Sequence, residues 1–272
     1  MLKLFYITNN PGIAAAAQSA GVDRIFVDME YMGKEERQPN MDTVKNHHTV
    51  EDVSKLRGVL DKSELLVRVN PIHKDSKKEI DDVINAGADV IMLPMWKSAE
   101  EIKQFISFVD KRVKTLPLLE TEDARLCLDE VLEIDGIDEM HIGLNDLHLN
   151  QGKKFLFELL TDGTVEEIAN KIRKRNIPFG FGGVGRVSKD DLLPAENILA
   201  EHYRLNSSMV ILSRSFCNTS NTTDINEIKR LFAEGVKENK EFEKMLENQS
   251  ESYFEEKHKQ TTDIIKQIVS EK

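Results

Sequence analysis

Short apolar segments alternate with stretches of helical periodicity along most of this chain. The segments are rich in Val, Ile, Leu and Phe, and the stretches between them repeat apolar residues at helical spacing. Successive segments begin 22 to 40 residues apart, which leaves room for a crossover helix between parallel strands. We expect eight strands, over residues 2–8, 24–30, 64–70, 89–95, 115–121, 139–145, 178–184 and 209–216.

Eight such βα units within 272 residues fit the α/β class, as a closed (β/α)8 or TIM barrel. An open doubly wound sheet is the alternative, but it requires a Gly-rich phosphate turn after the first strand, where residues 9–12 read Asn-Asn-Pro-Gly. We therefore expect a catalytic barrel over residues 1–223. Residues 224–272 read as C-terminal helices that pack on the barrel or on another subunit, as in a homo-oligomer.

The charge and cysteine content narrow the class of protein. The chain has 48 acidic and 37 basic residues, a formal charge of −11, which disfavours binding to nucleic acid or to an anionic membrane surface. Its two cysteines, Cys127 and Cys217, form neither a disulfide framework nor a CxxC metal motif. No apolar run reaches the length of a membrane span. We expect a cytoplasmic protein.

Polar residues at the ends of the predicted strands indicate where chemistry takes place, because TIM-barrel active sites lie at the carboxyl ends of the strands. These positions include Asp28, Glu30, Arg68, Glu120 and Asp146. Glu120 and Asp146 end adjacent strands, and two carboxylates with water and substrate oxygens suit a hard cation such as Mg²⁺. Arg68 would offer a bidentate fork to a substrate carboxylate. A salt-bridge layer that caps the barrel is the structural alternative.

Five of these segments together resemble the HpcH/HpaI aldolase and citrate lyase β-subunit family. They occur in the order of the family's motifs. They read FVDME at residues 26–30, LVRVN at 66–70, GADVIMLPM at 87–95, LLET at 118–121 and HIGLNDL at 141–147.

The resemblance implies a barrel of the phosphoenolpyruvate- and pyruvate-binding type that forms or cleaves a carbon–carbon bond next to a carbonyl. It implies a divalent metal, Mg²⁺ or else Mn²⁺ or Co²⁺, held by Glu120 and Asp146. Arg68 matches the arginine that contacts the oxo acid or its enolate, and the substrates would be a small 2-oxo acid and an aldehyde. We expect the substrate to lie against further residues at the strand ends, namely Pro94, Met95, Trp96 and Asn145.

The chain departs from the aldolase pattern directly after Glu30. Aldolase members usually have a histidine there, which acts as the base, and this chain has Tyr31. His47 or His48, in a polar insertion after the second strand, could fold back to replace it, and His148 is a further histidine close to Asp146. The alternative is that these three histidines are ordinary polar residues of a loop or a helix.

Two alternative functions follow from the departures. The acidic pair Asp28 and Glu30 with Tyr31 is also similar to the acyl-CoA lyase branch, which suggests an acyl-CoA lyase or hydrolase. The eighth strand ends Ser213-Arg214-Ser215 in place of the Gly-rich turn of the oxo-acid aldolases, so a non-catalytic oxo-acid-binding barrel is the other alternative. Arg214 could bind a second carboxylate or a phosphate of the substrate.

Overall fold

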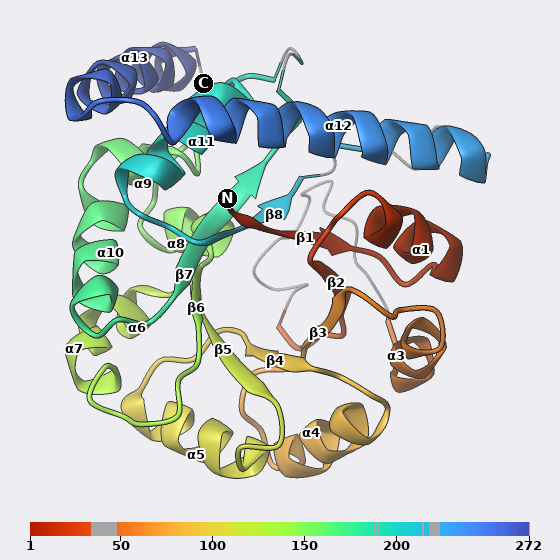
Figure 1. Ribbon diagram of the computed structural model, residues 1–272. Helices are drawn as coiled ribbons and strands as arrows, with labels where there is room; N and C mark the ends of the chain where they lie inside the picture. Colours follow the sequence, from red (N-terminus) through yellow and green to blue (C-terminus); the bar gives the residue numbers. More distant parts are fainter. Residues whose placement is uncertain (34–47, 188, 190, 214, 218–223, 272) are drawn as a thin grey trace.

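Eight parallel strands form a closed barrel in the computed structural model, which describes residues 1–33, 48–187, 189, 191–213, 215–217 and 224–271 (Figure 1). Each strand pairs with the next in the chain, and β8 closes onto β1. The predicted α/β fold class and TIM barrel are therefore confirmed. The strands are β1 (Lys3–Ile7), β2 (Arg24–Asp28), β3 (Glu64–Arg68), β4 (Val90–Leu93), β5 (Lys114–Leu119), β6 (Met140–Ile142), β7 (Phe179–Val184) and β8 (Met209–Leu212).

Helices surround this barrel on the outside (Figure 1). Around it lie α1 (Pro11–Ser19), α3 (Val50–Arg57), α4 (Ser76–Asn85), α5 (Ala99–Val109), α6 (Glu122–Leu126), α7 (Leu128–Val131), α8 (Leu144–Asn150), α9 (Glu158–Thr161), α10 (Thr164–Lys174), α11 (Ala195–Arg204), α12 (Ile225–Leu246) and α13 (Glu251–Ser270). The sixth strand ends at Ile142, three residues before its predicted end, because Gly143 caps helix α8 there. Asp146 consequently lies in the first turn of a helix.

The barrel interior is a small apolar layer that is separate from the larger core between strands and helices. Side chains alternate along a strand, so every second residue of each strand points inward. Asp28, Arg68 and Glu120 each follow an inward-pointing apolar residue by two positions, on β2, β3 and β5 respectively. Their side chains therefore also point inward. The inner layer consists of Phe5, Phe26, Leu66, Val90, Met92, Leu116, Leu118 and Met209.

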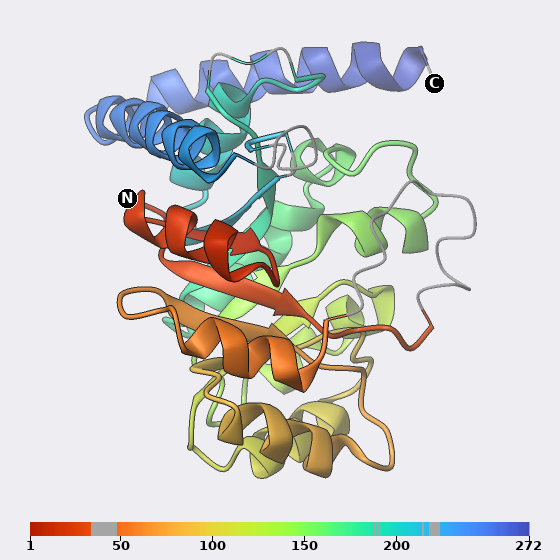
Figure 2. The same ribbon diagram turned by 90° about the vertical axis from the view of Figure 1, so that its right-hand side faces the viewer.

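Helices α12 and α13 lie together on one side of the barrel (Figures 1 and 2). α12 packs against α1 and α11, and its buried Glu243 accepts the backbone N–H of Leu2 at 2.6 Å. α13 packs against α11 and α9, where Asn197 Nδ2 donates to Thr261 Oγ1 at 3.0 Å. The C-terminal segment therefore covers the barrel of its own chain. No helix within the described ranges is long and apolar enough to cross a membrane.

Candidate active site

Arg68 and Asp28 form a two-pronged ion pair at the carboxyl end of the barrel. The two residues are register partners on β3 and β2, so their side chains emerge on the same side. Arg68 Nε donates to Asp28 Oδ1 at 2.8 Å, and the second nitrogen of this fork, Nη2, donates to Oδ2 at 2.9 Å. The planar fork fixes the orientation of the guanidinium.

Glu30 continues this arrangement from the turn after β2. It is 1% exposed, and its Oε2 lies 3.3 Å from Arg68 Nη1. Burial opposes the charge on Arg68, but the negative charges of Asp28 and Glu30 outweigh it and raise the pKa of Arg68 above its ordinary value. Two guanidinium N–H groups are hydrogen-bonded to Asp28, and Nη1 forms an ion pair with Glu30.

Glu120 lies at the end of β5 in a tight, almost fully buried position. Its Oε1 accepts the backbone N–H of Met95 at 3.1 Å, and Met95 adopts a left-handed conformation with φ of 54°, which is unfavourable for a residue with a side chain. A Cβ atom at Gly143 would lie 2.7 Å from Glu120 Cβ and 2.9 Å from Oε2, so glycine alone fits at that turn. Both features hold the carboxylate in one place.

The charges around Glu120 are unbalanced. Burial raises the pKa of Glu120 well above its ordinary value, and the negative charge of Asp146 raises it further. Arg68 opposes this effect, and Glu30 adds to it. Arg68 interacts with three carboxylates, those of Asp28, Glu30 and Glu120, and Asp146 adds a further negative charge beside Glu120. Additional positive charge would stabilise the ionised form of such a cluster.

The donor set suits a hard divalent cation that keeps part of its hydration shell. Glu120 directly follows β5 and Asp146 lies in the first turn of α8; both side chains are oxygen donors, and their mutual repulsion is what a cation would relieve. Within the part of the chain that the structure describes, no group of three or more His, Cys, Asp or Glu residues is arranged as a metal site. A metal held by this pair would therefore need water and substrate oxygens to complete its coordination.

His48 returns to the carboxyl end of β2, where its Nδ1 accepts the backbone N–H of Asp28 at 3.0 Å. A neutral imidazole that accepts at Nδ1 carries its proton on Nε2, so in this arrangement the ring has no lone pair left for a substrate proton. The geometry argues against the hypothesis that His48 replaces the missing base. Tyr31 is 62% exposed, and His47 lies outside the described residues.

Other predicted site residues occupy different environments. Trp96 is 1% exposed and belongs to the core between strands and helices, and its contact with the substrate stays a prediction. The Trp96 carbonyl accepts a hydrogen bond from Thr121 Oγ1 at 2.9 Å. Pro94 is buried, Met95 half-buried and Asn145 exposed.

Two further predictions concern His148 and Arg214. His148 is buried in α8, and its Nδ1 lies 3.1 Å from the carbonyl oxygen of Leu144 one turn earlier, so it is an ordinary helix residue. Arg214 lies outside the described residues. Sequence reasoning did not single out Asn70, whose Oδ1 accepts the N–H groups of Tyr31 and Met32 at 3.1 Å each. Its inward position two residues after Arg68 was the available signal.

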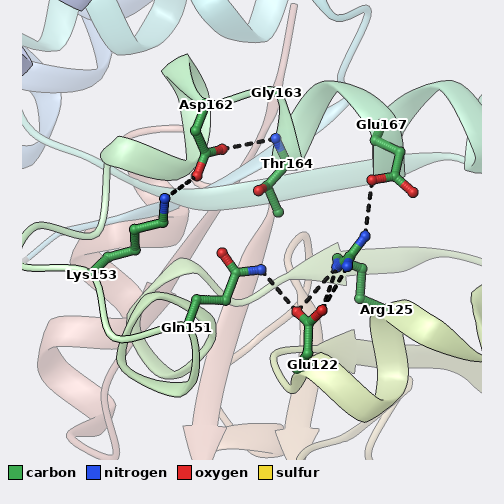
Figure 3. A pocket seen from close by; sticks show the side chains of 8 residues that line it. All are labelled: Glu122, Arg125, Gln151, Lys153, Asp162, Gly163, Thr164 and Glu167. Carbon is green, nitrogen blue, oxygen red and sulfur yellow. Dashed lines mark hydrogen bonds and ion pairs between the residues drawn. The ribbon is translucent and has the colours of Figure 1, made fainter.

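A cavity of about 590 Å³ lies beside this site, between α6, the segment after α8 and the start of α10 (Figure 3). Its charged side chains are paired with one another: Arg125 with Glu122 and Glu167, and Lys153 with Asp162. The residues around Glu120 and Arg68 do not line it. The cavity is therefore distinct from the carboxylate cluster.

Comparison with known sequences identifies the family. The sequence profile of the HpcH/HpaI aldolase/citrate lyase family matches residues 2–156, more than half of the chain. The chain belongs to this family. The matched region contains Asp28, Glu30, Arg68, Glu120 and Asp146, so this HpcH/HpaI protein has its whole carboxylate cluster within the family region. No curated protein sequence matches the chain.

Solved structures share the fold of this HpcH/HpaI protein at low sequence identity. An HpcH/HpaI aldolase from Desulfitobacterium hafniense DCB-2 is 16% identical, with a TM-score of 0.61, over 87% of this chain and 92% of that one. A family protein from Burkholderia cenocepacia J2315 is 14% identical, with a TM-score of 0.59, over 84% and 95%. Citrate synthase SbnG is 14% identical, with a TM-score of 0.61, over 84% and 92%. The family is of the lyase and aldolase type and generally depends on a divalent metal, which supports an enzyme.

Proposed function

We propose that this protein is a divalent-metal-dependent lyase that forms or cleaves a carbon–carbon bond next to the carbonyl of a small 2-oxo acid. The observation that carries the proposal is the charge pattern at the barrel mouth. Asp28, Glu30 and Glu120 act on a single arginine, which Asp28 holds through two hydrogen bonds, and Asp146 adds negative charge beside Glu120.

Glu120 and Asp146 are the residues that would hold the cation. When bound, a divalent cation, with Mg²⁺ the first choice and Mn²⁺ or Co²⁺ as substitutes, supplies Lewis-acid polarisation of a keto oxygen. The backbone N–H of Met95 and the close approach of Gly143 keep Glu120 aimed at one point. Because Glu120 is buried, solvent would screen its interaction with a bound cation only weakly.

Arg68 would orient the substrate and stabilise the enolate. Its guanidinium N–H groups match the two oxygens of a carboxylate, and its positive charge favours the developing negative charge on the adjacent carbonyl oxygen. Asp28 and Glu30 hold the guanidinium in place from the opposite side, so no reorientation is needed during the reaction. We assign Asp28 and Glu30 as positioning residues for Arg68.

The alternative is an acyl-CoA lyase or hydrolase on the same cluster. The observation in its favour is that no histidine takes the position of Tyr31, and that His48 uses Nδ1 for a backbone bond. The shared fold with citrate synthase SbnG is compatible with such carbonyl chemistry. Saturation by CoA thioesters, without turnover of free 2-oxo acids, would favour this alternative.

Deuterium exchange into the methyl group of pyruvate tests the proposal, because enolisation is common to the aldolase reactions. We expect metal-dependent exchange that stops in EDTA, and a loss of about 100-fold or more in Glu120→Gln because a metal-binding charge is removed. Glu100→Gln, an exposed residue of α5, is the matched control and should behave as the parent protein. Exchange that is independent of metal, or unchanged in Glu120→Gln, would contradict the proposal.

A further inference from the structure

A hydrogen-bonded junction joins the two elements that carry the proposed metal carboxylates. α6 begins two residues after Glu120, and α8 carries Asp146 in its first turn. The start of α6 and the end of α8 meet through Glu122, Asn150 and Gln151, which we call the α6–α8 latch.

The latch contains two direct bonds between segments 28 and 29 residues apart in the sequence. The backbone N–H of Glu122 donates to Asn150 Oδ1 at 2.8 Å, and Gln151 Nε2 donates to Glu122 Oε2 at 2.9 Å. Arg125 holds the same Glu122 carboxylate from the other side and also binds Glu167 of α10, at 2.9 Å. Figure 3 shows Gln151, Glu122, Arg125 and Glu167 in this order along the wall of the cavity.

The strand ladder itself stops below the two carboxylates. β5 and β6 pair through Leu118 with His141 and through Leu119 with Ile142, and the last bond between them runs from Gly143 N–H to the Leu119 carbonyl at 2.8 Å. Glu120 lies one residue beyond this bond and Asp146 three residues beyond it. The spacing of the two carboxylates therefore depends on how the short helix α8 is oriented relative to α6.

The latch fixes that orientation at the far end of α8. A helix of seven residues moves as one body, so a restraint on Asn150 at its C-terminus also restrains Asp146 in its first turn. The negative charges of Glu120 and Asp146 repel each other. The latch opposes separation of the two elements that carry them.

We propose that Glu122, Asn150 and Gln151 are positioning residues that set the Glu120–Asp146 spacing and thereby the affinity for the divalent cation. The inference rests on the proposed metal site. Residues that orient metal ligands commonly change metal affinity by 10- to 100-fold, and because the latch acts through a helix we expect the lower end of this range.

Mn²⁺ binding, measured from the electron paramagnetic resonance signal of free Mn²⁺, tests the proposal without any assay of activity. We expect the double variant Asn150→Ala/Gln151→Ala to bind Mn²⁺ about tenfold more weakly than the parent protein, with a folded circular dichroism spectrum in EDTA. Asn150→Asp keeps an oxygen acceptor for the Glu122 N–H and should retain most of the affinity. Asn248→Ala, at the end of α12, removes a comparable exposed asparagine bond and should leave the affinity unchanged.

The outcomes separate this inference from the proposed function. If the parent protein binds Mn²⁺ and the double variant binds it equally well, the latch has no positioning role, while the metal site stands. If Asn150→Asp binds Mn²⁺ as weakly as the double variant, an oxygen acceptor for the Glu122 N–H does not determine the affinity, and the inference is likewise overturned. If the parent protein binds no Mn²⁺, both the metal site and the role of the latch are overturned.

Discussion

The two ends of the barrel each contain a buried arginine held by carboxylates, yet they have opposite charge balances. At the amino-terminal end, Arg24 is 0% exposed; it donates through Nη1 and Nη2 to Glu139 and through Nε to Glu64 at 2.7 Å. Lys3 also binds Glu139, at 2.9 Å, and Lys114 binds Glu64, at 2.5 Å. In this network three cationic side chains, Arg24, Lys3 and Lys114, pair with the two carboxylates of Glu139 and Glu64.

The pKa values follow these balances. Burial alone would raise the pKa values of Glu139 and Glu64, but the arginine and lysine partners outweigh it and lower both. At the carboxyl-terminal end, burial and Asp146 raise the pKa of Glu120, and Arg68, which also interacts with Asp28 and Glu30, does not offset them. The amino-terminal carboxylates are neutralised by neighbouring cationic side chains, as expected for stability, whereas negative charge predominates around Glu120 at the end where TIM-barrel active sites lie.

Removal of Arg24 should give the largest effect on folding. Arg24→Met leaves Glu139 buried with one lysine as its remaining partner, and we expect a loss of about 3 to 5 kcal/mol in the free energy of unfolding. Urea denaturation measures this loss. Arg125→Met, which removes a more exposed arginine that also binds two carboxylates, should cost about 1 kcal/mol or less. Equal losses in the free energy of unfolding for Arg24→Met and Arg125→Met would contradict the contrast between a buried ion-pair network and a more exposed one.

His141 should make the barrel sensitive to acid. It lies on β6, where burial, and to a smaller extent Arg24 and Arg68, lower its pKa to about 4. Between pH 6.5 and pH 4 the unfolded chain binds a proton that the folded protein excludes, so stability is complete above pH 6.5 and falls on acidification. From pH 7 to pH 5 this residue should contribute a loss of about 2 kcal/mol.

Chemical denaturation of His141→Gln at both pH values isolates this contribution. The variant should show a smaller difference between pH 7 and pH 5 than the parent protein. A substitution of the half-exposed His258, whose Nδ1 lies 2.8 Å from Glu201 Oε1, is the control and should not reduce the acid sensitivity in this way. If the stability of His141→Gln changes with pH as much as that of the parent protein, groups other than His141 cause the acid sensitivity.

Glu120→Gln should stabilise the metal-free protein, the smallest of the three effects. Because the pKa of Glu120 is raised in the fold, ionisation of Glu120 favours the unfolded chain, and its contribution to stability falls as the pH rises above the ordinary value of 4.5. At pH 8 in EDTA we expect the variant to gain about 1 kcal/mol, measured by urea denaturation. Excess Mg²⁺ should stabilise the parent protein and leave the variant unchanged. A less stable variant in EDTA would mean that Glu120 is already neutralised within the chain.

The sequence alone predicts the barrel and most of the cluster because both depend on local properties. The length of an apolar segment and its period of two place each strand and its inward positions, and Asp28, Arg68 and Glu120 occupy such positions. Only the strand ends were misplaced, as at β6, where the turn at Gly143 and the helix after it replace the last predicted strand residues.

The tertiary structure decided what depends on residues far apart in the chain. It buried Trp96, brought His48 to the backbone of Asp28, paired Arg24 with Glu139 across 115 residues and joined Glu122 to Asn150. None of these contacts has a local signal, because each depends on where loops and helices meet once the barrel has closed. The sequence determined which side chains reach the mouth of this barrel, and the packing around them decided which carry an unbalanced charge.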